Sequence, residues 1–189
     1  MDGPQTYQRL ADEALMLRYR DGEIPAFEPL YQRHKGGMYR YLLRGCGSAA
    51  QADELFQDVW LSLVKARERY APSAKFATYL YRIAHNRLID YYRHHGLELE
   101  SPLPEGEDDD SWHGKHHDGP EQIVAAQQQA VRVVAVIDNL PIEQREALLL
   151  FEEGGLNVEE IAAATGVDKE AAKSRLRYAF NKLRRALQE

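Results

Sequence analysis

The stretch NVEEIAAATGVDKEAAKSRLRYAFNKLRRAL, residues 157–187, has the layout of two helices joined by a tight turn. Asn157 and Glu160 stand three residues apart at the start of the first helix, which is the spacing of a capping box. Gly166 stands where the turn needs a residue that tolerates a positive φ. We therefore predict a helix-turn-helix in this part of the chain.

The second helix of this motif separates apolar from basic side chains. At 100° per residue, Leu176, Phe180, Leu183 and Leu187 fall within a narrow arc. Residues 173–188 include six bases and no acid, whereas a solvated face usually mixes both signs of charge. The pattern favours a recognition helix that enters the major groove of DNA, with a purely solvated basic helix as the alternative. The candidate DNA-binding residues of this helix are Lys173, Ser174, Arg175, Arg177, Tyr178, Lys182 and Arg184.

The acidity of the 189-residue chain comes from one segment. The formal net charge is -6, and residues 96–121 alone carry nine acids against one base. Residues 1–95 have a net charge of +3 and residues 122–189 a net charge of -1, so the overall acidity does not argue against nucleic-acid binding by either flank. The acidic segment also holds three Pro and four Gly and shows little hydrophobic periodicity. It is typical of a flexible linker between two domains.

Both flanks of the linker are predicted to be helical, which makes the fold class all-α with two small helical domains. Leu55, Val59 and Leu63 form one apolar seam at helical spacing, and no stretch alternates apolar and polar residues as a strand would. Gly45 and Gly47 are expected to close the helix that precedes this seam.

Several function classes find no support in the sequence. We find no Gly-rich phosphate loop, catalytic triad or metal-ligand cluster, so we predict no enzymatic activity, no cofactor and no small-molecule substrate. Cys46 is the only cysteine, which excludes an internal disulfide. No apolar run approaches about 18 residues, and the N-terminus lacks a secretion signal, so we expect a cytoplasmic protein without membrane insertion. His113, His116 and His117 are open to two interpretations, a metal site or plain linker composition, and we favour the second.

A second distinctive stretch is FATYLYRIAHNRLIDYYR, residues 76–93, which combines aromatic and basic side chains with a single acid. Aromatic rings can stack on exposed bases, and Asn can read the edge of a flipped base. By helical spacing, Tyr79, Arg82, Asn86 and Arg93 share one face, whereas Tyr81, Tyr91 and Tyr92 are expected to be core packing.

Four stretches together resemble the extracytoplasmic-function (ECF, group 4) sigma factors of the sigma-70 family of bacterial RNA polymerase. They are residues 52–70, 76–93, 140–162 and 172–187, in the order typical of that family. The resemblance implies region 2 in residues 1–95 and region 4 in residues 122–189. Region 2 binds the beta-prime clamp helices and opens the -10 element, and region 4 binds the beta-flap tip and reads the -35 element.

The resemblance also implies roles for particular residues and partners. Asp53, Glu54, Gln57 and Asp58 match the acidic signature that binds core RNA polymerase, although acids near a helix start could also reflect the helix dipole. The partners implied are core RNA polymerase, promoter DNA and an anti-sigma factor. The residues expected at the -10 element are Lys75, Phe76, Tyr79, Arg82, Asn86 and Arg93.

The sequence departs from the family pattern at several positions. Ala74-Lys75 replaces the usual Gly-Ser, Tyr79 replaces the usual Trp, and Glu170-Ala171-Ala172 replaces the common Gly-Thr-Val at the start of the recognition helix. Promoter preference is therefore expected to differ from that of relatives.

Two other functions compete with an alternative sigma factor that directs polymerase to promoters. One is a stand-alone helix-turn-helix regulator, and the other is an interaction module that retains the sigma fold. The acidic stretch at residues 53–58 and the aromatic stretch at residues 76–93 favour the sigma factor, because a stand-alone regulator needs neither. The acids of residues 105–110 have two interpretations: they occupy a basic polymerase channel until the transcript displaces them, or they only keep the linker soluble and extended, and we favour the first.

Overall fold

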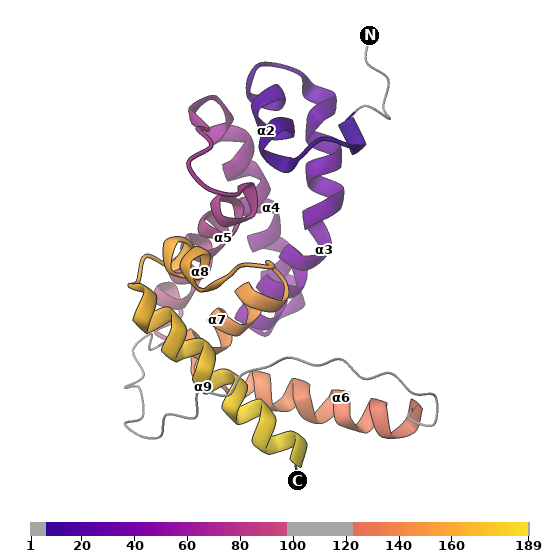
Figure 1. The fold of residues 1–189 in the computed structure, drawn as a ribbon, viewed down its shortest axis with the longest axis vertical. Coiled ribbons are helices and arrows are strands. Elements are labelled where there is room, and N and C mark those ends of the chain that lie inside the picture. The colour runs from indigo at the N-terminus through magenta and orange to yellow at the C-terminus, as the bar shows by residue number, and fades with distance from the viewer. Residues whose placement is uncertain (1–6, 98–122, 189) are drawn as a thin grey trace.

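The computed structural model describes residues 7–97 and 123–188 and places them in helices and short connections, without a strand in either range. Figure 1 shows the helices in their spatial order. Their bounds are α2 Asp12–Arg20, α3 Phe27–Cys46, α4 Ala49–Ala66, α5 Phe76–His94, α6 Ile123–Asp138, α7 Ile142–Glu152, α8 Val158–Thr165 and α9 Lys169–Gln188. The all-α prediction is confirmed. Residues 98–121 of the predicted linker 96–121, with its three histidines and residues 105–110, lie outside the described residues.

The first domain is built around three long helices, α3, α4 and α5, with α2 packed beside α3 and α5. The predicted seam of α4 is confirmed, because Val59 and Leu63 are fully buried and Leu55 is nearly so. Leu80 and Leu88 of α5 face the same core, where burial of each such side chain contributes about 1.5–3 kcal/mol.

The connection from α3 to α4 differs in one respect from the sequence prediction. Helix α3 ends at Cys46, and Gly47 forms its left-handed cap with φ of 70°. Gly45 was expected to help close the helix but lies within its last turn. A Cβ there would stand 2.8 Å from a methyl group of Leu88, so this glycine allows α5 to approach α3 closely.

The second domain contains the predicted helix-turn-helix. At the start of α8, the backbone amide of Glu160 donates to Asn157 Oδ1 and the amide of Asn157 donates to Glu160 Oε2, both at 2.9 Å, which completes the capping box. Gly166 ends α8 in the left-handed region with φ of 74°. Helix α9 packs against α6, α7 and α8, and its buried side consists of Ala172, Leu176 and Ala179.

The predicted apolar arc of α9 is only partly buried. Phe180 and Leu183 pack against the core, but Leu187 is 45% exposed. Leu187 lies at the end of α9, where the small domain no longer covers the helix.

The two domains pack directly on one another, which periodicity in the sequence did not indicate. Helix α8 lies beside α5, and α7 lies beside α3 (Figure 1). At Gly37 of α3 an added Cβ would stand 2.6 Å from the carbonyl oxygen of Glu153, so only glycine permits this approach of the second domain.

Candidate nucleic-acid and polymerase interfaces

The face of α5 predicted to meet DNA is largely open to solvent. Arg82, Asn86 and Arg93 are exposed, and Tyr79 is half-buried. Tyr81 and Tyr92, which were expected to pack in the core, are buried at 1% exposure each, whereas Tyr91 is only partly covered.

Phe76 does not share the open face of α5. Its side chain is fully buried, with its ring centroid 5.3 Å from that of His34 and 6.3 Å from that of Tyr70. The expectation that this ring stacks on a base is not compatible with the structure, because the ring has no exposed surface. Phe76 is a core residue, and its neighbour Lys75 is exposed at the start of the helix.

A pocket of about 390 Å³ opens between α4 and α5 beside Tyr79 and Asn86. Lys65, Arg69 and Arg87 also line it, and none of the residues around it is acidic. Its volume falls in the range of ordinary ligand pockets. A concave site that combines an aromatic ring, an amide and cations suits a nucleobase with its phosphate.

The phenol rings beside this pocket are uncharged at neutral pH. Burial raises the pKa of Tyr79, and burial together with the nearby charge of Glu13 raises the pKa of Tyr70 to about 12. The two rings meet edge to face with centroids 5.1 Å apart. Tyr70 therefore holds one side of Tyr79, which leaves the half-exposed remainder of the ring toward the pocket.

The four acidic-signature residues are brought together on one exposed face of α4. Asp53, Glu54, Gln57 and Asp58 all face solvent, while the seam on the opposite side is buried. The first turn of α4 contains no acid, because the helix begins at Ala49. An interaction with the helix dipole falls off within the first turn, so it does not account for these acids.

One apolar residue on this acidic face was missed in the sequence. Leu61 is 53% exposed and lies three residues after Asp58 and four after Gln57, on the same side of α4. The three- and four-residue spacing was the available signal, and it places an apolar side chain at the C-terminal edge of the acidic face.

The candidate DNA-binding residues of α9 differ in their exposure to solvent. Lys173 and Lys182 are exposed, whereas Ser174, Arg175, Arg177, Tyr178 and Arg184 are half-buried. The guanidinium carbon of Arg177 lies 5.3 Å from the centroid of the Tyr178 ring, a cation–π contact. Glu170 is exposed in the first turn of the same helix, so an acid does lie near the predicted DNA contacts.

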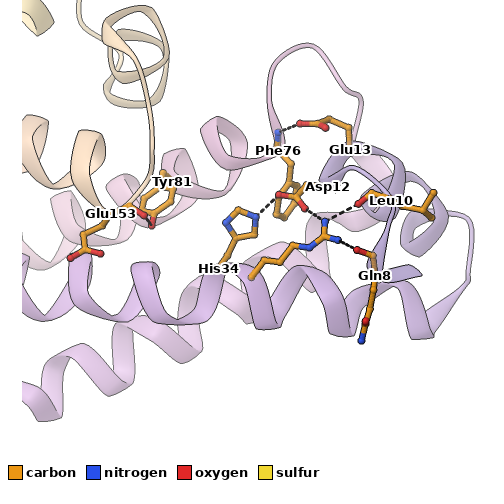
Figure 2. Close-up of polar contacts among 9 residues, drawn as sticks. Gln8, Leu10, Asp12, Glu13, His34, Phe76, Tyr81 and Glu153 are labelled. Atoms are coloured by element: carbon orange, nitrogen blue, oxygen red, sulfur yellow. Dashed lines mark hydrogen bonds and ion pairs between the residues drawn. The ribbon is translucent and has the colours of Figure 1, made fainter. Parts of the chain in front are cut away.

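The surface between the two domains contains buried polar groups that sequence reasoning missed. Oε1 of Glu146 on α7 accepts a hydrogen bond from the Tyr41 hydroxyl at 2.7 Å and lies 2.7 Å from Nδ1 of His85. The Tyr81 hydroxyl donates to the backbone carbonyl of Glu153 at 2.9 Å, as Figure 2 shows.

Two ion pairs also join the two domains. Arg40 pairs with the side chain of Glu153 at 2.7 Å, and Lys75 pairs with Glu160 at 2.8 Å. Lys75 is one of the residues predicted to contact DNA, and here its ammonium group is held by the second domain.

Two family models match separate parts of the chain. Residues 30–98 match the family described as Sigma-70 region 2, and residues 130–187 match Sigma-70, region 4. The chain is 31% identical over 182 residues to the RNA polymerase sigma factor CarQ of Myxococcus xanthus, covering 92% of this chain and 96% of that protein. It is 33% identical over 174 residues to the ECF RNA polymerase sigma factor RpoE of Cereibacter sphaeroides, covering 90% of this chain and 92% of that protein.

Solved structures agree on the fold. The structure of CnrH in complex with the cytosolic domain of CnrY superposes with a TM-score of 0.67 at 24% identity, over 95% of this chain and 98% of that chain. The sigma factor RpoE of Bartonella quintana, solved with the anti-sigma factor NepR, gives a TM-score of 0.62 at 18% identity, over 86% of this chain and 96% of that chain.

The chain belongs to the ECF sigma factors of the sigma-70 family. It is a transcription initiation factor and not an enzyme, so its sites act by binding polymerase and promoter DNA. Within the described residues, no helix is both long and apolar enough to span a bilayer.

Proposed function

We propose that the pocket between α4 and α5 captures an unpaired base of the -10 element. The single observation that carries this proposal is the position of Tyr79 and Asn86 at one concave site lined by cations and without acids. Stacking on an aromatic ring contributes about 1–3 kcal/mol per base. This contact stabilises the unpaired base relative to the same base paired in the duplex.

Different side chains around the pocket perform different tasks. The ring of Tyr79 stacks, and the amide of Asn86 reads the base edge. No group in the described ranges hydrogen-bonds the Asn86 side chain, so its donors and acceptor are available. Lys75, Arg82 and Arg93, exposed along α5, bind the sugar–phosphate backbone that presents the base.

The acidic face of α4 binds core polymerase in this proposal. Asp53, Glu54, Gln57 and Asp58 supply polar contacts, and the exposed Leu61 at the C-terminal end of this face supplies an apolar one, a combination of polar and apolar contacts common at protein interfaces. The resemblance to the family assigns the beta-prime clamp helices as the partner. A stand-alone helix-turn-helix regulator would not need this face.

Region 4 reads the -35 element through α9 and binds the beta-flap tip. Lys173, in the second turn of α9, is exposed, and the ring of Tyr178 lies against the half-buried Arg177. Bidentate contact of an Arg with a guanine is worth about 1–3 kcal/mol of discrimination. Two further proposals rest on the family resemblance: regulation by an anti-sigma factor, and action in the cytoplasm.

The test measures promoter opening at equal occupancy of core polymerase. Tyr79→Ala and Asn86→Ala are expected to lower binding of a single-stranded -10 oligonucleotide about fivefold to a hundredfold and to lower permanganate reactivity near the start site. Asn139→Ala serves as the control, because it removes an exposed amide outside the pocket. Undiminished reactivity in both pocket variants would contradict the proposal.

A further inference from the structure

The N-terminal end of α5 lacks a capping side chain of its own. Lys75 occupies the N-cap position and makes no side-chain hydrogen bond to the first turn. The first backbone N–H groups of any helix have no partner within the helix, so an acceptor must come from elsewhere. The connection before it, residues 71–75, is exposed throughout and offers little packing to hold the helix start.

Glu13 of α2 supplies the missing acceptor. The backbone N–H of Phe76 donates to Glu13 Oε1 at 2.7 Å, across 63 positions in the chain (Figure 2). A carboxylate at this place also interacts favourably with the positive end of the helix dipole. The cap of α5 is therefore provided by a different helix.

Helix α2 is itself fixed, so Glu13 is held in position. The neighbouring Asp12 accepts hydrogen bonds from Arg33 Nη1 and contacts His34 Nε2, each at 2.6 Å, which ties α2 to α3. Although burial opposes ionisation, the bonds from His34 and Arg33 hold the pKa of Asp12 below its ordinary value. Figure 2 shows the Asp12–His34 contact next to the Glu13–Phe76 bond.

The residue capped by Glu13 belongs to a chain of ring contacts that ends at the base pocket. The Phe76 ring packs against Tyr70, and Tyr70 packs against Tyr79. Lys75, which precedes the capped amide, is exposed at the same helix end. A shift of this helix end would therefore move both the stacking ring and a backbone-binding cation.

We infer that Glu13 is a positioning residue for capture of the -10 base: through the Phe76 amide it fixes the start of α5, and with it Tyr79 and Lys75. Glu13 lies outside the residues that match region 2, which begin at residue 30. The inference rests on the proposed function of the pocket, and the experiment separates the failure of one from the failure of the other.

The structural arm of the test needs no DNA. Amide hydrogen exchange at single-residue resolution is compared in the full chain for the wild type, Glu13→Ala, Glu13→Asp and Glu13→Gln. Loss of a helix cap of ordinary strength corresponds to about tenfold faster exchange in the first turn of α5. We expect this at Phe76 for Glu13→Ala and for Glu13→Asp, whose side chain is shorter by one methylene. Glu13→Gln keeps both the reach and an acceptor oxygen, and should stay close to the wild type.

The functional arm uses the same variants bound to core polymerase. We expect Glu13→Ala and Glu13→Asp to lower permanganate reactivity at the start site about fivefold to tenfold at equal core occupancy, with rescue by Glu13→Gln. Glu28→Ala is the matched control, since the carboxylate of Glu28 is exposed and accepts a bond from Gln32 within α3. If Glu13→Ala does not fold, Glu13→Asp, which keeps the charge, carries the comparison.

Each remaining outcome overturns a defined part of the reasoning. Unchanged exchange at Phe76 in Glu13→Ala and Glu13→Asp would show that Glu13 does not cap α5. Faster exchange with unchanged promoter opening would show a cap without a positioning role. If Tyr79→Ala also opens the promoter normally, the pocket assignment itself is wrong, and the exchange data then stand alone.

Discussion

Glu146 is the residue through which docking of the two domains is best tested. Its side chain is 5% exposed, and it faces the Tyr41 hydroxyl and the His85 ring of the first domain. Burial and the adjacent carboxylate raise the pKa of Tyr41 well above its usual value. The hydroxyl therefore stays protonated and donates a hydrogen bond to Glu146. Replacement of Glu146 by Ala removes the acceptor, which leaves the buried Tyr41 hydroxyl and the part-buried His85 ring without their partner.

The size of the effect of Glu146→Ala on domain docking follows from the two donors that lose their acceptor. A buried donor without a partner costs about 1–3 kcal/mol, and the Tyr41 hydroxyl, which is fully buried, regains water only when the domains separate. Glu146→Ala should therefore weaken docking by about 3 kcal/mol, roughly a 150-fold change in the ratio of docked to separated domains. Arg40→Ala is the matched control. Its side chain is 59% exposed, and an exposed ion pair such as Arg40–Glu153 contributes about 0–1 kcal/mol.

The assay is energy transfer between dyes placed on the two domains, followed through a urea titration below the unfolding transition. The shift in the midpoint gives the difference in the free energy of separation between variants. We expect a large shift for Glu146→Ala and a small one for Arg40→Ala. Equal shifts, or none for Glu146→Ala, would refute the view that the buried cluster dominates docking.

Three further variants test separate surfaces. Asp58→Arg should abolish association with core polymerase while leaving helicity unchanged by circular dichroism, and normal co-purification with core would contradict the assignment. Arg177→Ala should relax discrimination between bases at one -35 position by about 1–3 kcal/mol. Arg184→Ala should instead lower the affinity for all promoter sequences by a similar amount and flatten the salt dependence of binding. Equal losses of affinity for both variants on every promoter would show that the two residues do not have separate roles. Asp12 has a lowered pKa in the fold, so its contribution to stability is present above about pH 4 and is lost as the pH falls further. Asp12→Asn should therefore lower the free energy of unfolding at pH 7 and reduce the dependence of that free energy on pH between about 5 and 3. Identical acid-unfolding curves for the variant and the wild type would contradict this.

Local features of the fold could be predicted from the sequence because their partners are close in the chain. The capping box at Asn157 needs only the residue three positions on, and the seam of α4 follows from helical periodicity. The exposure of the acidic signature at Asp53 to Asp58 follows from the same periodicity, since the opposite side of the helix is apolar.

Features that depend on distant contacts could not be predicted. Phe76 stands among bases in the sequence and suggested a DNA contact, but Tyr70 and His34 enclose its ring. Glu146 resembles any polar residue of an amphipathic helix, and its partners lie 61 and 105 positions away. A pattern within one helix contains no information on which other domain covers it.

Lys75 connects domain docking to promoter binding. Its ammonium group lies 2.8 Å from Glu160 of α8, and its side chain is 61% exposed. If Lys75 binds a DNA phosphate, the phosphate competes with Glu160 for the ammonium group, because two anions held at one cation repel each other. The Glu160 side chain is 14% exposed, but the ammonium group is open to water, so the pair contributes about 1 kcal/mol and the phosphate can displace the carboxylate at little cost.

Glu160→Gln isolates this competition. Gln keeps an oxygen that can accept the hydrogen bond from the Asn157 backbone amide, and the substitution removes only the charge. We expect the free Glu160→Gln protein to bind a single-stranded -10 oligonucleotide up to about fivefold more tightly than the wild type. This corresponds to about 1 kcal/mol, the contribution of one weak ion pair. Glu159→Gln is the neighbouring control, since Glu159 pairs with Lys169 inside region 4 and does not face the first domain. Fluorescence anisotropy at two salt concentrations measures both variants. Equal affinities for the wild type and Glu160→Gln would show that the contact of Lys75 with region 4 does not compete with DNA.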